Sequence, residues 1–136
     1  MKYTAQATTD GNGRNGAVRT NDGLIDLRLG IPKEIGGAGG DVSNPEQLFA
    51  AGYSACFMSA LSTVARQERV KLVDASVTAF VTIAHDGEAF GLSVELVADL
   101  PGVDSAIAGR LLEGAHAKCP YSRAVSGNIP VTVRHA

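Results

Sequence analysis

The sequence predicts an α+β protein with the element order βββ-α-ββ-α-β, in which two antiparallel sheets surround a long central helix. Three observations lead to this class. Short segments that alternate apolar and polar residues lie on both sides of a stretch of 19 uncharged residues, Gln47 to Ala65. Strong turn signals separate those short segments. One later segment has its apolar residues at helical spacing, which predicts a second helix.

The N-terminal third is predicted to form a small antiparallel meander. Residues 3–9 alternate small or apolar with polar side chains, and a short strand is expected over residues 17–20. The turn Asn21-Asp22-Gly23 leads into a strand that carries Ile25, Leu27 and Leu29 on one face. A loop that contains five glycines, residues 30–43, connects this meander to the central helix.

The central helix has a clear start. Asn44 can cap it, Pro45 suits its first position, and Gln47 can complete a capping box. The helical pattern continues to about Arg69. Its first half, residues 48–61, is apolar or small on every face, and such a helix must be covered on every face. Because the rest of the chain is too small to cover it completely, we expect a second copy of the chain to cover part of it.

The uncharged stretch is not expected to cross a membrane. A spanning helix needs about 20 strongly apolar residues. This stretch is rich in Ala and Gly and contains five polar residues, Gln47, Ser54, Ser59, Ser62 and Thr63. We therefore predict a helix that is buried in protein.

The C-terminal half supplies the remaining elements. Strands are predicted over residues 74–85 and 91–100, with the turn Asp86-Gly87 between them. Asp104 can cap the second helix, and Pro120 should end it near Cys119. The apolar stripe of that helix consists of Ile107, Leu111, Leu112 and Ala115, and the last strand carries Ile129, Val131 and Val133.

Length and composition restrict the class of protein. The 136 residues predict a single domain, residues 1–136. With 45% hydrophobic and 19% charged residues the chain is not disordered, and a net charge of −2 without a basic stripe argues against nucleic acid as a partner. No secretion signal is evident at the N-terminus. The chain has only two cysteines and no disulfide framework, so we expect it in the reducing cytoplasm. A disulfide there is more often catalytic than structural.

The two cysteines are the main candidates for chemistry. Free cysteines are commonly small buried hydrophobes, so a structural role for both is the simplest interpretation. However, Cys119 lies in a Cys-Pro-Tyr-Ser segment similar to that of glutaredoxin-like sites. In such sites the attacking cysteine begins a helix, whereas here the helical pattern precedes Cys119, so Cys119 suits the role of a second thiol. Cys56, in the middle of an apolar helix, needs a cation to become a thiolate, and Arg14 between glycines is a candidate.

A metal site has little support. His116 and Cys119 are three residues apart on one helix face, but no further pair has the spacing of metal ligands. No metal and no organic cofactor is expected.

The residues resemble a known family. Residues 44–57, NPEQLFAAGYSACF, are similar to the signature helix of the organic hydroperoxide resistance proteins, the Ohr branch of the Ohr/OsmC family. Residues 115–122, AHAKCPYS, resemble the second cysteine motif of that family. Residues 13–16, GRNG, are similar to its arginine loop, which more often has the sequence GGRDG. The resemblance extends over essentially the whole chain, in order and in spacing.

The resemblance implies an OsmC-like fold and a thiol peroxidase that reduces alkyl and fatty-acid hydroperoxides to alcohols. It implies that Cys56 is the peroxidatic thiolate and Cys119 the resolving thiol. Arg14 would stabilise the thiolate and the peroxide, and Glu46 would orient Arg14. The family forms an intertwined homodimer and is reduced again by dithiols, notably those of lipoylated proteins, so both are implied as partners here.

Two other classes of function remain open from the residues. One is a thiol–disulfide oxidoreductase that uses Cys119. The other is a non-catalytic module that binds lipids or senses redox state through an apolar interface. The first predicts activity that depends on Cys119 alone, and the second predicts fatty-acid binding without peroxide consumption.

Overall fold

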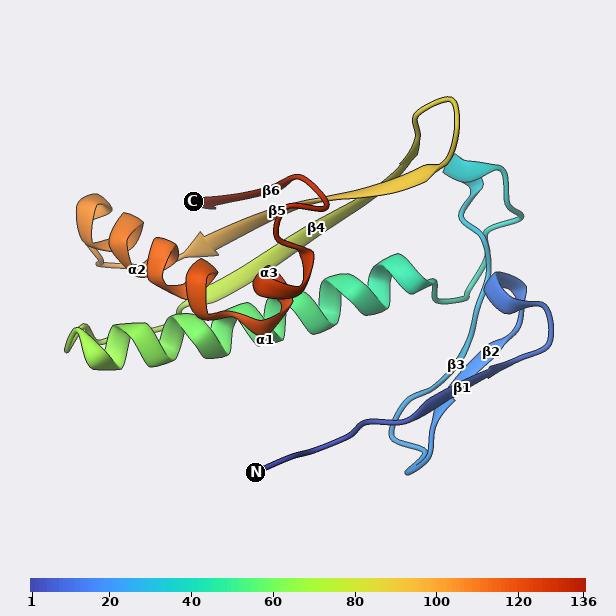
Figure 1. The fold of residues 1–136 in the computed structure, drawn as a ribbon, viewed down its shortest axis with the longest axis horizontal. Coiled ribbons are helices and arrows are strands. Elements are labelled where there is room, and N and C mark those ends of the chain that lie inside the picture. The colour runs from blue at the N-terminus through green and yellow to red at the C-terminus, as the bar shows by residue number, and fades with distance from the viewer. The chain divides into compact units, whose positions relative to one another are not determined.

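The structure is a computed structural model that describes all 136 residues, and the chain divides into two compact units, Met1–Leu48 and Phe49–Ala136. It has the predicted α+β class, with two three-stranded sheets and one long helix, α1 (Pro45–Gln67), shown in Figure 1. Each unit contains one of the sheets. The single domain that the length predicts stays a prediction.

The first unit contains the predicted antiparallel meander. Its strands are β1 (Ala7–Asp10), β2 (Ala17–Thr20) and β3 (Asp26–Arg28), with β2 in the middle. The first strand is shorter than predicted and lacks residues 3–6. Because β2 ends at Thr20, which is paired with Ala7, the residues before Ala7 have no strand beside them.

Two short 3₁₀ turns interrupt the loops of this unit. The turn η1 (Gly13–Asn15) lies between β1 and β2, and η2 (Lys33–Ile35) lies in the glycine-containing loop after β3. That loop returns to the meander at its end, where Ser43 forms a parallel bridge with Leu29. The end of the loop is thereby fixed where α1 begins.

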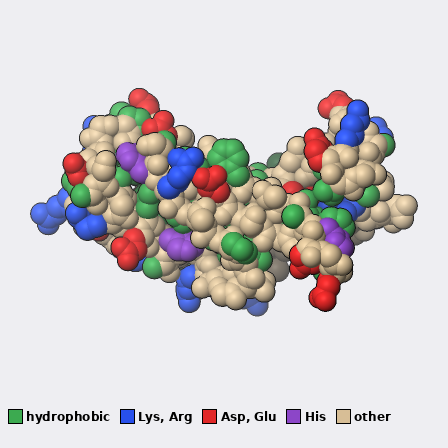
Figure 2. Space-filling model, turned by 90° about the horizontal axis from the view of Figure 1, so that it is seen from above, with side chains coloured by type: hydrophobic (Ala, Val, Ile, Leu, Met, Phe, Trp, Pro, Cys, Tyr) green, Lys and Arg blue, Asp and Glu red, His purple; other side chains and the backbone are tan.

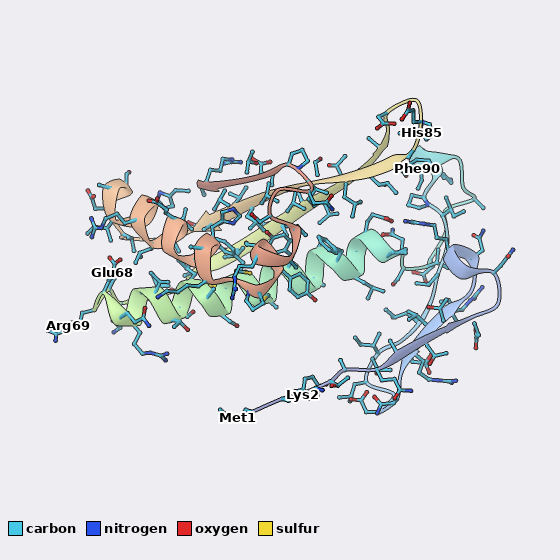
Figure 3. All side chains as sticks on the ribbon, in the orientation of Figure 1. Met1, Lys2, Glu68, Arg69, His85 and Phe90 are labelled. Carbon is cyan, nitrogen blue, oxygen red and sulfur yellow. The ribbon has the colours of Figure 1, made fainter.

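Helix α1 begins as predicted. The side-chain oxygen of Asn44 accepts a hydrogen bond from the Gln47 amide at 2.8 Å, and the side-chain oxygen of Gln47 accepts one from the Asn44 amide at 3.2 Å. These two bonds complete the predicted capping box. The helix ends at Gln67, two residues before the predicted end, because Arg69 adopts a left-handed conformation with φ of 59°. Figure 3 labels Arg69 where the chain leaves α1.

By length and composition alone, α1 would also be long and apolar enough to cross a membrane. A single helix of this kind is weak support for a membrane span, because core helices meet the same criterion. One third of its most apolar window is buried inside the protein.

The second unit contains the strands β4 (Ser76–His85), β5 (Phe90–Asp99) and β6 (Val131–His135). β4 and β5 form an antiparallel hairpin, at whose tip the rings of His85 and Phe90 lie 5.0 Å apart (Figure 3). β6 is parallel to β5, so the prediction of a wholly antiparallel second sheet was wrong. The helical connection after β5 returns the chain to the end of the sheet where β5 starts. The chain therefore runs through β6 in the same direction as through β5.

Two helices form that connection, α2 (Ser105–Lys118) and α3 (Pro120–Val125). The carboxylate of Asp104 caps α2 as predicted, accepting hydrogen bonds from the amides of Ala106 and Ile107. Helix α3 was not predicted. Pro120 ends α2, but a proline at a first helical position also begins a helix readily, and here it does both.

The hydrophobic core of the second unit lies between α1, α2 and one face of the sheet (Figure 1). Alternate residues of β5 point into it, which confirms the predicted inward face of that strand. Its most buried members include Tyr53, Phe57, Leu61, Val94, Leu96, Ala98, Leu111, Ala115 and Cys119. On the face of the molecule in Figure 2, acidic and basic side chains are interspersed with hydrophobic ones.

Candidate functional site

Arg14 and Glu46 form a two-pronged ion pair in the first unit. Arg14 Nη1 donates to Glu46 Oε2 at 2.9 Å, and Arg14 Nη2 donates to Glu46 Oε1 at 2.7 Å. The η1 turn presents Arg14, while Glu46 stands in the first turn of α1. The Arg14 side chain is 40% exposed and that of Glu46 only 11%. The carboxylate therefore holds the guanidinium in one orientation while leaving part of it accessible.

The pKa values of this pair shift as the contact requires. The hydrogen bond from Arg14 lowers the pKa of Glu46 below its ordinary value, against an opposing effect of burial. The same hydrogen bond raises the pKa of Arg14. Both groups are therefore charged at neutral pH.

The tight turn at Arg14 depends on glycine. A Cβ atom on Gly16 would lie 2.0 Å from the carbonyl oxygen of Asp10. Because that oxygen belongs to the backbone, no side-chain rotation could relieve the clash. Gly13 has a φ of +58°, a conformation that L residues with a side chain rarely adopt. The glycines on both sides of Arg14 thus allow the turn that presents it.

In the second unit, the two cysteines meet across 63 positions of sequence. The Sγ atoms of Cys56 and Cys119 lie 3.6 Å apart, and both thiols are free. Cys56 is half-buried, whereas Cys119 is fully buried. A disulfide bond is about 2.05 Å long, so a small local movement would join the two sulfur atoms.

The surroundings of Cys56 do not by themselves favour a thiolate. Burial is the main cause that raises the pKa of the Cys56 thiol, and the neighbouring Cys119 thiol raises it further. A hydrogen bond from the backbone of Tyr121 acts in the opposite direction. This agrees with the expectation that Cys56 needs a cation in order to react as a thiolate.

Cys119 occupies the junction of two helices. It ends α2 and immediately precedes α3, with an extended backbone at φ −61° and ψ 123°. The expectation that a helix only precedes Cys119 was therefore wrong, because the Cys-Pro-Tyr-Ser segment also opens α3. The junction directs the sulfur of Cys119 into the core and toward Cys56.

Aromatic side chains surround this region of α1. The rings of Phe49, Tyr53 and Tyr121 form a cluster with centroid separations of 5.6 to 6.0 Å. Tyr121 approaches α1 where Gly52 has no side chain, and a Cβ atom there would lie 2.7 Å from the Tyr121 hydroxyl. The α1 segment before Cys56 is thus lined by aromatic surface.

A buried hydroxyl was missed by the sequence reasoning. Ser122 Oγ lies 2.9 Å from the Tyr53 hydroxyl and 2.9 Å from His116 Nδ1. Tyr53 and Ser122 each stand three positions from a cysteine, one before Cys56 and the other after Cys119. That shared spacing was the signal available in the sequence. His116 was considered only as a metal ligand, and no three His, Cys, Asp or Glu residues lie together as a metal site would require.

The four predicted site residues therefore form two pairs. Arg14 and Glu46 belong to the first unit, and Cys56 and Cys119 belong to the second. Their roles in a reaction stay predictions.

Comparison with known proteins identifies the family. Residues 38–134 match the family model described as OsmC-like protein. An organic hydroperoxide resistance protein of Xanthomonas axonopodis pv. citri (strain 306) is 48% identical over 132 residues, which cover 96% of this chain and 92% of that protein. The organic hydroperoxide resistance protein OhrA of Bacillus subtilis (strain 168) is 43% identical over 141 residues, covering 98% and 96%.

Solved structures agree with this assignment. The crystal structure of an organic hydroperoxide resistance protein from Elizabethkingia anophelis has a TM-score of 0.92 and 47% identity, and the match covers 100% of this chain and 97% of that one. An OsmC-like protein from Mycoplasma pneumoniae, only 12% identical, still gives a TM-score of 0.78, which shows the shared fold. From its sequence and its fold, the chain belongs to the organic hydroperoxide resistance proteins of the OsmC-like family.

Proposed function

We propose that this protein is a thiol-dependent peroxidase that reduces organic hydroperoxides, alkyl and fatty-acid, to alcohols. The observation that carries the proposal is the Cys56–Cys119 pair, in which a half-buried thiol lies 3.6 Å from a fully buried one. Relatives named for organic hydroperoxide resistance support a role in peroxide resistance. The pair supplies what such a role needs, a sulfur that can be oxidised and a second sulfur that can rescue it.

The chemistry proceeds in three steps. The Cys56 thiolate attacks the outer oxygen of the hydroperoxide, the O–O bond breaks, and the alkoxide takes a proton and leaves as the alcohol. Cys56 is then a sulfenic acid. The sulfur of Cys119 attacks the sulfur of Cys56, the S–O bond breaks, and the hydroxide leaves as water with the proton of the thiol. An external dithiol, for which we propose the lipoyl group of a lipoylated protein, reduces the disulfide by thiol–disulfide exchange.

Arg14 is proposed to make the first step possible. Since burial raises the pKa of Cys56, a thiolate there needs a nearby positive charge. A guanidinium has five N–H donors, and Glu46 uses two of them, so the others can bind the thiolate and the peroxide oxygen on which charge develops. Glu46 is proposed to orient Arg14 for this task.

A homodimer in the cytoplasm is part of the proposal. One face of α1 carries exposed small residues in a single chain, namely Ala51, Ala55, Ser59 and Ser62. A mostly uncharged face of a helix whose buried residues lie in the core is suited to packing against a second copy. Sedimentation should then give twice the chain mass of 14.0 kDa.

The proposal is tested with the reduced protein and one equivalent of tert-butyl hydroperoxide, followed by disulfide mapping by mass spectrometry. We expect a Cys56–Cys119 disulfide and one equivalent of alcohol. Cys56→Ser should abolish consumption of the peroxide, and Cys119→Ser should leave Cys56 as a sulfenic acid, which a second equivalent of hydroperoxide over-oxidises. An unmodified Cys56 in the wild type would refute the proposal.

A second test concerns the cation. Arg14→Ala should slow the oxidation of Cys56 by about 10- to 100-fold, which corresponds to about 1.4 to 2.7 kcal/mol. Arg19→Ala is a matched control, because Arg19 is exposed in the neighbouring strand β2. Equal rates for Arg14→Ala and Arg19→Ala would remove Arg14 from the mechanism.

The alternative of a thiol–disulfide oxidoreductase that attacks with Cys119 fits the geometry less well. Cys119 has no exposed surface, so a bulky disulfide substrate cannot reach its sulfur without opening the core. Activity on mixed glutathione disulfides that is lost in Cys119→Ser but kept in Cys56→Ser would favour this alternative.

A further inference from the structure

Ser122 is buried, with an exposed fraction of 2%, and its hydroxyl bonds with two polar groups from different helices. The Tyr53 hydroxyl comes from α1 and His116 Nδ1 from α2, while Ser122 itself belongs to α3. Each distance is 2.9 Å. We call Tyr53, Ser122 and His116 the Ser122 network.

The network connects the helices that carry the two cysteines. Cys56 lies on α1, one turn after Tyr53, and Cys119 lies between α2 and α3. A single hydroxyl therefore links the helix of Cys56 to both helices that flank Cys119. Because a hydroxyl has one hydrogen to donate and two lone pairs that accept, Ser122 can bond with both partners at once while donating to at most one of them.

We propose that the Ser122 network is a positioning device that holds the Cys119 sulfur where it can bond with the Cys56 sulfur. The inference rests on the proposed function for its role in turnover, since fast disulfide formation protects the sulfenic acid. Apart from the contacts that Cys56 itself makes with Cys119 and the Tyr121 backbone, the three helices are held at this point by apolar packing, which restricts orientation less than hydrogen bonds do. The bond with Tyr53 is buried and the bond with His116 is partly buried, and none of the buried side-chain polar atoms in the chain lacks a partner.

The positioning matters because two reactions compete for the sulfenic acid of Cys56. In one, Cys119 displaces hydroxide and the disulfide forms with release of water. In the other, a second hydroperoxide transfers an oxygen to the same sulfur, which becomes a sulfinic acid, while the hydroperoxide is reduced to alcohol. The intramolecular reaction gains its advantage from the prepared geometry of the two sulfurs.

The test measures how the sulfur of Cys56 divides between these products. Reduced Tyr53→Phe, Ser122→Ala and wild type are titrated with tert-butyl hydroperoxide, and mass spectrometry gives the ratio of sulfinic acid to disulfide. We expect the ratio to rise about 2- to 10-fold in both variants, the change that loss of one buried hydrogen bond corresponds to. Ser126→Ala, at the exposed end of the same short helix, is the matched control and should keep the wild-type ratio.

Substitution of His116 separates positioning from general loss of stability. His116→Asn keeps a polar atom near the place of Nδ1 and should restore most of the wild-type ratio, whereas His116→Leu should behave like Ser122→Ala. A purely structural role would lower the free energy of unfolding in all variants without changing the ratio. An unchanged ratio in both Tyr53→Phe and Ser122→Ala would therefore overturn the proposal.

A second measurement needs no peroxide. The Cys56–Cys119 disulfide is equilibrated with mixtures of reduced and oxidised glutathione, and the effective concentration of the two thiols is obtained from the midpoint. We expect this value to fall about 2- to 10-fold in Ser122→Ala and to stay unchanged in Ser126→Ala. If the wild type consumes no peroxide but shows this difference, the proposed function fails and the positioning role stands. Equal midpoints in the two variants would contradict the positioning role itself.

Discussion

Replacement of Glu46 by Gln tests whether its carboxylate holds Arg14 through charge. The variant keeps the size and one oxygen of the side chain but removes the negative charge. In the wild type both carboxylate oxygens accept from Arg14, at 2.7 and 2.9 Å. Exposed ion pairs contribute about 0 to 1 kcal/mol, and breaking a buried pair costs about 3 to 5 kcal/mol. Arg14 is 40% exposed and Glu46 is 11% exposed, so the pair is partly screened by solvent. Its contribution to stability should therefore lie between those of an exposed and a buried pair, at about 1 to 2 kcal/mol.

The assay is a double-mutant cycle of urea unfolding with Glu46→Gln, Arg14→Gln and both together. The coupling between the two residues should be about 1 to 2 kcal/mol at pH 7. Glu95→Gln and Arg134→Gln provide the control cycle, because that pair is also 2.7 Å long but both side chains are more exposed. We expect a coupling below about 0.5 kcal/mol for the control.

The pH dependence of this coupling has a definite sign. Arg14 lowers the pKa of Glu46 below its ordinary value of 4.5. The stabilisation is therefore fully present above pH 4.5 and is lost as the pH falls through the lower pKa of the folded state. A coupling below about 0.3 kcal/mol at pH 7, or one that persists unchanged after Glu46 is protonated, would refute the reasoning.

Three further substitutions test the fold that carries the candidate site. Asp104→Ala removes the cap of α2 and should lower the free energy of unfolding by about 1 kcal/mol in urea titrations. Asp104→Asn keeps a capping oxygen and should leave the stability nearly unchanged. Gly16→Ala should cost about 2 to 3 kcal/mol by the same assay, because its Cβ would meet the carbonyl of Asp10 at 2.0 Å, and an unchanged stability would contradict the turn geometry. Leu111→Ala, at a fully buried position, should cost about 2 to 5 kcal/mol, and a loss under 1 kcal/mol would place Leu111 outside the core.

Local signals in the sequence predicted much of the fold. The capping box of Asn44 and Gln47 and the cap at Asp104 were confirmed because a cap depends on residues within one turn of each other. The inward face of β5 was confirmed because alternation follows from the geometry of a strand. Which strands pair with each other is not set by local signals, because pairing depends on where the chain returns after a long connection. The parallel pairing of β6 with β5 was missed for this reason.

The missed helix α3 shows a second limit of local patterns. Pro120 disfavours continuation of α2, and the sequence reasoning treated it only as an end. The same residue has a backbone φ suited to starting a helix, so one proline carried two signals of opposite meaning. This omission affects the candidate site, because α3 supplies Ser122. The segment after Cys119 is a helix that is hydrogen-bonded to α1 through Ser122 and Tyr53, and not a simple bend.

The two pairs of predicted site residues complement each other chemically. In the second unit, Cys56 has a second thiol at 3.6 Å, and burial raises its pKa, so a thiolate there would need a cation. In the first unit, Arg14 is an oriented cation with donors to spare after Glu46 has taken two of them. In the proposed reaction the cation of the first pair serves the thiol of the second. The proposed enzyme consequently requires that Arg14→Ala and Cys56→Ser impair the same step, the first oxidation, whereas Ser122→Ala impairs the step that follows it.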